Sequence, residues 1–170
     1  MDFLELAKNR YSVRSFRPDP VPEELIEKVL EAAYVAPTAC NKQAFRVLAV
    51  TSPEGMARFR RCTACHFGAP MGFIICADRG AQWVRPFDGE GSGVVDASIV
   101  TTHMMLEAAS LGLGSTWVMY FEPEAVYTEF ALPDRLEPVA LLPMGYPSQS
   151  AAPSELHTQY RDPGELTERC

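Results

Sequence analysis

An almost continuous helix-forming run, residues 95–111, constrains the fold more than any other part of this sequence. The run reads VDASIVTTHMMLEAASL and carries apolar side chains on several helical faces, and Gly112 stands where such a helix would end. A helix that is apolar nearly all round is usually buried on more than one side. We therefore expect this helix either at the centre of the domain or against a second subunit.

Shorter helices and buried strands are predicted before and after this run in the sequence. Helical spacing and helix-start signals predict helices at residues 2–10, within 19–37, at 53–61 and at 123–130. β-rich runs predict strands or extended segments at residues 45–50, 71–77, 115–121 and 138–146, and the polar residues 78–93 are predicted to form a loop. Strands and helices mix without strict alternation, which favours an α+β layer fold over a doubly wound one. The chain has no internal repeat and no linker, so we expect residues 1–170 to form a single domain.

The composition limits the partners and the compartment. The formal net charge of -7 and the pI near 5.0 argue against nucleic acid or an anionic membrane as the main partner. No apolar run reaches the roughly 20 residues of a membrane span. Asp2 and Glu5 interrupt the first turn, so we expect no signal peptide. The five cysteines are an odd number without the spacing of a disulfide framework, which favours reduced thiols in the cytoplasm.

A local cluster of basic residues stands out in this acidic chain. Lys8, Arg10 and Arg14 lie within the stretch KNRYSVRSF, and Arg17 follows it directly. In a chain of net negative charge, such a cluster indicates one small anionic ligand. The alternative interpretation is a solvated helix end.

The segment 62–65, CTAC, also admits two interpretations. A C-x-x-C spacing occurs in redox pairs and in half of a zinc site. The sequence has no second C-x-x-C, and the only further ligand nearby is His66, so we expect no metal site. The alternative is two ordinary reduced cysteines on a short helix. Within the apolar run, we interpret Asp96 as a helix-start residue and His103 as a packed core or interface residue.

Several segments, in order along the chain, resemble the FMN-dependent nitroreductase family. Residues 10–14, RYSVR, are similar to its R-x-S-x-R/K opening, and residues 36–50, APTACNKQAFRVLAV, are similar to its A-P-S-x-x-N-x-Q-P-W-x-F strand entry. Residues 94–121 resemble the central helix and following strand of the family, and LLPMGYP with the later Arg161 closes the match. The match covers nearly the whole chain, and the ordered set is more specific than any one segment.

The resemblance implies both a fold and a cofactor. The fold is a three-layer α+β sandwich in which helices flank a mixed, mainly antiparallel sheet, and the chain forms an intertwined homodimer with FMN at its interface. Such a site needs cations and hydroxyls for the phosphate and a flat apolar wall for the ring. It also needs positive charge at the pyrimidine edge of the ring, which becomes anionic on reduction.

By resemblance, the two ends of FMN are held by different residues. Arg10 and Ser12 would bind the phosphate and ribityl chain, Arg14 would face the pyrimidine edge, and Arg161 would be a second phosphate ligand. Tyr11 stands where the family often has a second basic residue, and Gln159 where it often has lysine, so fewer cations would face the phosphate.

The remaining expected contacts surround the ring. A stretch of the second subunit would lie against the ring and supply an amide network, and a loop before residue 71 would bring one cysteine to the pyrimidine. The segment after the central helix would pass near the redox edge. The full expected FMN-binding set is Arg10, Tyr11, Ser12, Arg14, Pro37, Thr38, Ala39, Asn41, Gln43, Cys65, Trp117, Val118, Met119 and Arg161.

The function implied by the resemblance is a flavin oxidoreductase. NADH or NADPH would reduce FMN and leave, and an electron-poor small molecule such as a nitroaromatic or a quinone would then bind in the same place, which predicts ping-pong kinetics. No side chain stands out as an essential acid or base, so we expect the cofactor to carry the chemistry. Two alternatives stay open. One is the same fold with dehalogenation, enal or semialdehyde reduction, or flavin breakdown; the other is a flavin-binding protein that serves storage or sensing without turnover.

Overall fold

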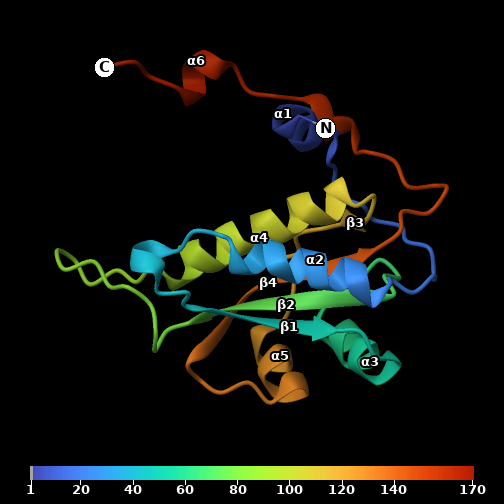
Figure 1. Ribbon diagram of the computed structural model, residues 1–170, viewed down its shortest axis with the longest axis horizontal. Helices are drawn as coiled ribbons and strands as arrows, with labels where there is room; N and C mark the ends of the chain where they lie inside the picture. Colours follow the sequence, from blue (N-terminus) through green and yellow to red (C-terminus); the bar gives the residue numbers. More distant parts are fainter. Residues whose placement is uncertain (1) are drawn as a thin grey trace.

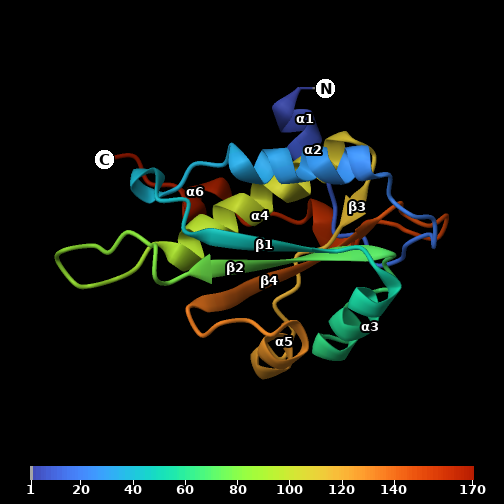
Figure 2. The same ribbon diagram turned by 60° about the horizontal axis from the view of Figure 1, so that its bottom comes forward.

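A four-stranded sheet lies between two layers of helices in the computed structural model, which describes residues 2–170 (Figures 1 and 2). The strand order is β1-β2-β4-β3, and every neighbouring pair is antiparallel. The strands are β1 (Phe45–Val50), β2 (Met71–Asp78), β3 (Gly114–Ser115) and β4 (Leu136–Gly145). One isolated bridge, between Ser12 and Ser115, is parallel, so the pairing is mixed and mainly antiparallel. The predicted α+β sandwich is confirmed.

Two helices cover each face of the sheet, as Figure 2 shows. Helices α2 (Glu23–Tyr34) and α4 (Gly93–Ser110) lie on one face, and α3 (Pro53–Cys62) and α5 (Pro123–Phe130) lie on the other. Strand β2 is buried along its whole length because both faces are covered. Phe73 and Ile75 pack toward α2 and α4, whereas Ile74 and Cys76 pack on the side of α3 and α5.

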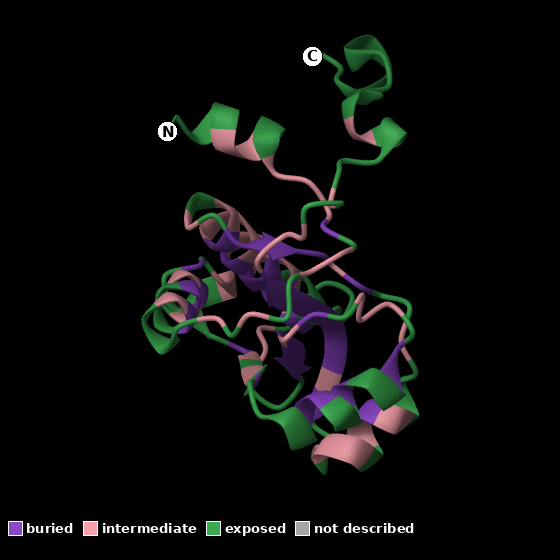
Figure 3. Ribbon diagram, turned by 90° about the vertical axis from the view of Figure 1, so that its right-hand side faces the viewer, coloured by how far each residue is buried: buried purple, intermediate pink, exposed green. Residues whose placement is uncertain are grey.

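The two ends of the chain stand away from this sandwich and lie near each other (Figure 3). They carry helix α1 (Phe3–Asn9), the 3-10 turn η2 (Glu155–Thr158) and helix α6 (Pro163–Leu166). The His157 ring lies edge-on to the Tyr11 ring, with 6.3 Å between their centroids, and its Nε2 is 3.0 Å from the carbonyl oxygen of Lys8. The two terminal segments therefore contact each other, while helix α1 also contacts α4.

Helix α4 is deeply buried on the side that faces α2 and the sheet, within one of the two helix layers. Ala97, Val100 and Met104 are fully buried in the core between α2, α4 and the sheet. The start of the helix also has an outward face, where Val94 and Val95 are 46% and 60% exposed. A buried inner face and an exposed apolar outer face leave room for a further partner on α4.

The strand predicted for residues 115–121 is much shorter in the structure. Strand β3 ends at Ser115, and only Val118 pairs again, with Leu141 of β4. The next residue, Thr116, donates its N–H to the carbonyl of Pro143 in β4 at 3.3 Å. Pro143 has no N–H to return a bond, so the ladder breaks at this point.

Candidate functional site

The basic segment after α1 is pinned to the edge of the sheet. The N–H of Val13 donates to the carbonyl of Ser115 at 3.0 Å, and the hydroxyl of Thr116 donates to the carbonyl of Val13. Gly114 permits this close approach, because a Cβ on it would lie 2.5 Å from Cγ2 of Val13. Residues 10–14 therefore have a fixed backbone beside β3.

The arginines of the basic segment and of the C-terminal segment differ in their partners. Arg17 pairs with Asp19 at 2.8 Å, and Arg161 pairs with Glu165 at 3.1 Å in the C-terminal segment. Nη1 of Arg10 lies 4.0 Å from Sδ of Met105, and Nη1 of Arg14 donates to the carbonyl of Ser12 at 3.3 Å. Among the described residues neither Arg10 nor Arg14 forms an ion pair, so both keep guanidinium donors for an anion.

The segment 117–119 continues from the same edge of the sheet. Val118 is held to Leu141 by two backbone hydrogen bonds of 2.9 and 3.0 Å. Nε1 of Trp117 is buried without a hydrogen-bond partner in the described part of the chain, and Met119 is 72% exposed. A buried N–H normally has a partner. Residues 117–119 follow directly after Ser115 and Thr116, the two residues that bind the backbone of Val13.

The loop with Cys65 is tied to this segment as well. The hydroxyl of Thr63 donates to the carbonyl of Tyr120 at 2.5 Å and accepts the N–H of Cys65 at 3.0 Å. Thr63 and Tyr120 line an open cleft of about 430 Å³, with Arg60, Arg61, Cys62, Ala64, Phe121 and Glu122. Cys65 is therefore close to the chain that follows Val118.

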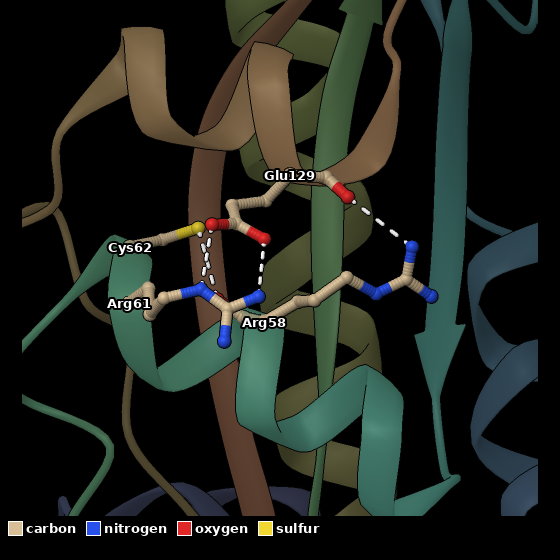
Figure 4. Close-up of polar contacts among 4 residues, drawn as sticks. All are labelled: Arg58, Arg61, Cys62 and Glu129. Atoms are coloured by element: carbon tan, nitrogen blue, oxygen red, sulfur yellow. Dashed lines mark hydrogen bonds and ion pairs between the residues drawn. The ribbon is translucent and has the colours of Figure 1, made fainter.

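An ion pair and a hydrogen bond between α3 and α5 hold the start of this loop (Figure 4). Nε and Nη2 of Arg61 both donate to the Glu129 carboxylate at 2.6 Å, and Nη1 of Arg58 donates to the Glu129 carbonyl at 3.2 Å. The Arg61 guanidinium lowers the pKa of Glu129. Burial raises the pKa of the Cys62 thiol to about 11. A buried, protonated thiol favours packing over redox chemistry for Cys62, and the described residues contain no cluster of three or more metal-ligating side chains.

The predicted ring-wall residues form a turn that follows α2. They include the 3-10 turn η1 (Ala39–Asn41), and Nε2 of Gln43 donates to Oδ1 of Asn41 at 3.1 Å. The N–H of Ala39 donates to Oδ1 of Asp96 on α4 at 2.9 Å. Ala39 and Asp96 also line an open cleft of about 630 Å³ together with Trp83, Arg85, Glu90, Gly91, Ser92, Val95 and Ile99.

The predicted FMN-binding residues fall into two groups, one around η1 and one beside β3. The two groups lie toward opposite ends of α4, as Figure 1 shows for η1 and β3. Ala39 contacts Asp96 near the start of the helix, and Arg10 contacts Met105 nine residues further along. At 1.5 Å per residue, these contacts are about 14 Å apart along the helix axis. The single chain therefore does not gather all the predicted residues into one cleft.

Comparison with known proteins decides the family. The sequence model of the nitroreductase family matches residues 7–69 and 63–146. The chain belongs to the nitroreductase family. A curated relative from Methanothermobacter thermautotrophicus, provisionally named NADH dehydrogenase/NAD(P)H nitroreductase, is 31% identical over 163 residues, which cover 92% of this chain and 83% of the relative.

Solved nitroreductase structures share the whole fold. A nitroreductase family protein from Clostridium difficile superimposes with a TM-score of 0.92 and 43% identity, over 99% of this chain and 98% of that one. A nitroreductase-like protein from Exiguobacterium sibiricum, crystallised in complex with FMN, superimposes with a TM-score of 0.84 over 100% of this chain and 98% of that one. At 20% identity, the second likeness shows the fold alone.

Two contacts in this nitroreductase lie beyond what the sequence predicts. The sequence predicts Asp96 only as a helix-start residue, yet its carboxylate also accepts the N–H of Ala39, 57 residues away. The sequence predicts Thr116 only as part of a strand, yet its hydroxyl donates to the Val13 carbonyl in the basic segment. An acidic residue at the start of a nearly apolar helix was the available signal for Asp96, and Thr116 carried none.

The thiol environments predict a ranking of cysteine reactivity. At pH 7.5, a thiol-alkylating reagent should label exposed Cys40 and Cys170 rapidly. Cys62 and Cys76 should react at least about 100-fold more slowly, because burial raises their pKa to about 11 and about 12 and depletes the thiolate. Mass spectrometry of a labelling time course measures the ranking. Labelling of Cys62 as fast as that of Cys40 would contradict it and restore the redox interpretation.

Proposed function

We propose that this nitroreductase-family chain is an FMN-dependent oxidoreductase that takes electrons from NADH or NADPH. The observation that carries the proposal is the pair of arginines, Arg10 and Arg14, that form no ion pair among the described residues and whose backbone is fixed to Ser115 and Thr116. The family match, the NAD(P)H nitroreductase name of one relative and the FMN complex of one structural neighbour support it. We further propose that residues 1–170 act as one domain.

The residues present fit a phosphate and a flavin ring. Guanidinium groups match phosphate oxygens with parallel donors, and Arg10 with the hydroxyl of Ser12 supplies such a set for the phosphate end. The buried Nε1 of Trp117, which has no partner among the described residues, is an unused donor in the same region. Tyr11 lines the cleft of about 150 Å³ that Arg10 also lines. We assign Cys65 and residues 117–119 to the ring.

Arg14 has a separate task in this proposal. Bound FMN supplies the capacity to accept a hydride and to pass electrons on. A fixed guanidinium at the pyrimidine edge stabilises negative charge there, which favours the reduced cofactor. The 3.3 Å hydrogen bond from Arg14 to the carbonyl of Ser12 restrains this guanidinium. Protons come from solvent or substrate, since no side chain of the site is assigned as an acid or base.

A second copy of the chain would complete the site. In a two-fold symmetric dimer, the outer faces of two α4 helices pack antiparallel, so the Ala39 end of one lies beside the Arg10 end of the other. The exposed Val94 and Val95 on α4, and the terminal segments that stand away from the core, support this homodimer (Figure 3). Pro37, Thr38, Ala39, Asn41 and Gln43 of one subunit would then face the ring held by the other. The C-terminal segment with Arg161 would be ordered by the same contact.

Open clefts near the proposed site support a range of small-molecule acceptors. The cleft beside Thr63 and the cleft beside Ala39 both open to solvent. We propose that electron-poor small molecules, such as nitroaromatics and quinones, replace the nicotinamide after it leaves, in a ping-pong sequence.

In the described part of the chain, no helix is long and apolar enough to cross a membrane. The odd number of cysteines supports a cytoplasmic location.

Cofactor uptake and reduction test the proposed function. The purified protein should be yellow or take up FMN on titration, and anaerobic stopped-flow mixing with NADH or NADPH should bleach the flavin absorbance, as expected for a flavin that accepts a hydride. Re-oxidation by a quinone should then restore the absorbance. Absence of FMN uptake would overturn the cofactor assignment. FMN uptake without bleaching by either nicotinamide would leave a binding protein and refute the oxidoreductase.

Alanine substitutions of Arg10 and Arg14 should have different effects on FMN binding and on its reduction potential. Arg10→Ala should weaken FMN binding by about tenfold or more, because a charge-assisted bond to the phosphate is lost. Arg14→Ala should lower the reduction potential of bound FMN more than Arg10→Ala does. FMN titration and spectroelectrochemistry measure the two effects, with Arg17→Ala as a control because Arg17 is paired with Asp19. The reverse ordering would mean that the ligand lies in the opposite orientation.

A further inference from the structure

The turn that follows α2 has a strained backbone. Cys40, Asn41 and Gln43 have φ angles of 50°, 51° and 50°, a left-handed region that side-chain-bearing residues rarely adopt. Such conformations persist where the surrounding structure fixes them, and they gather at functional sites. Asn41 and Gln43 are also the amides that the proposed function places at the flavin.

Two of the hydrogen bonds that shape this turn are internal to it. The N–H of Gln43 donates to Oγ1 of Thr38 at 2.9 Å, and the side chain of Gln43 donates to Asn41 at 3.1 Å. These bonds set the shape of the turn but move with it as a unit. They do not fix its position against the rest of the domain.

Asp96 supplies an anchor from outside the turn. Its side chain is 2% exposed, Oδ1 accepts the Ala39 N–H at 2.9 Å, and Oδ2 accepts the hydroxyl of Ser92 at 2.8 Å. Ser92 in turn donates its N–H to the carbonyl of Trp83 at 2.8 Å. Both carboxylate oxygens are therefore used, one on the turn and one on the end of the 78–93 loop. A buried carboxylate with both oxygens bonded is costly to disturb.

We propose that Asp96 is a positioning residue of the flavin site. Its carboxylate holds the strained turn in place on α4, and through the turn it sets where Asn41 and Gln43 meet the cofactor. This inference rests on the proposed function for its effect on FMN. The anchoring of the turn is a property of the chain alone, and it has its own measurement.

Three variants separate anchoring from helix capping. Asp96→Ala removes both bonds of the carboxylate, whereas Ser92→Ala removes only the bond on the helix-start side and leaves Ala39 bound. Asp96→Asn retains an oxygen that can accept the Ala39 N–H. If Asp96 only stabilises the start of α4, Asp96→Ala and Ser92→Ala will behave alike.

The alkylation rate of exposed Cys40 reports on the position of the turn. The alkylation rate of Cys170, in the C-terminal segment, is the internal reference. Without FMN, Asp96→Ala should raise the alkylation rate of Cys40 relative to Cys170, and Ser92→Ala and Asp96→Asn should not. With FMN, Asp96→Ala should bind the cofactor about tenfold more weakly than Ser92→Ala does, and Asp96→Asn should stay within about threefold of the wild type. The potential of the bound flavin should shift in Asp96→Ala only.

The outcomes distinguish the two proposals. Failure of the wild type to take up FMN refutes the proposed function, while the Cys40 rates still decide whether Asp96 anchors the turn. Equal Cys40 rates in Asp96→Ala and Ser92→Ala overturn the inference, as does equal FMN binding by these variants when the wild type binds FMN. Should Asp96→Ala not fold, Ala39→Pro removes the donor of the same bond at the first position of a 3-10 turn, where proline is tolerated. An unchanged Cys40 rate in Ala39→Pro also overturns the inference.

Discussion

The burial of α4 between α2 and the sheet is the contact on which the rest of the structure depends. Ala97, Val100 and Met104 are completely buried there, so the helix is fixed in position along its length. Near the start of α4, Asp96 binds the turn that contains Asn41. Further along the helix, Met105 contacts Arg10. A rigid helix between the two groups sets their separation, and Val95 on its outer face stays exposed.

Electrostatics explain why a chain with a net charge of -7 can still bind an anion. Several arginines form ion pairs on the surface. Examples are Arg17 with Asp19 and Arg61 with Glu129. Arg10 and Arg14 form no such ion pair in the described residues, so under the proposed function their charge faces the cofactor. The backbone bond from Val13 to Ser115 holds them in place, which reduces the entropy lost when an anion binds.

Local sequence signals predicted the layers and the basic segment but not the contacts that unite them. The apolar run of α4, the buried strand β2 and the R-x-S-x-R segment each depend on residues close in sequence, and each was predicted. The bond between Ala39 and Asp96 joins residues far apart, and no local pattern specifies it. The early end of β3 depends on Pro143 facing Thr116, which requires the strand order to be known. The separation of Arg10 from Asn41 likewise appears only once α4 is placed between them.

A mixed-dimer experiment tests most directly whether the flavin site is shared between two chains. Copies carrying Arg10→Ala are combined with copies carrying both Asn41→Ala and Gln43→Ala, and mixed dimers are isolated with two different affinity tags. If each site takes Arg10 from one chain and Asn41 from the other, one site of the mixed dimer is fully wild type. FMN titration should then show one site of wild-type affinity per dimer, although both parent dimers bind weakly. Weak binding at both sites of the mixed dimer would show that each chain builds its own site, and would contradict the account.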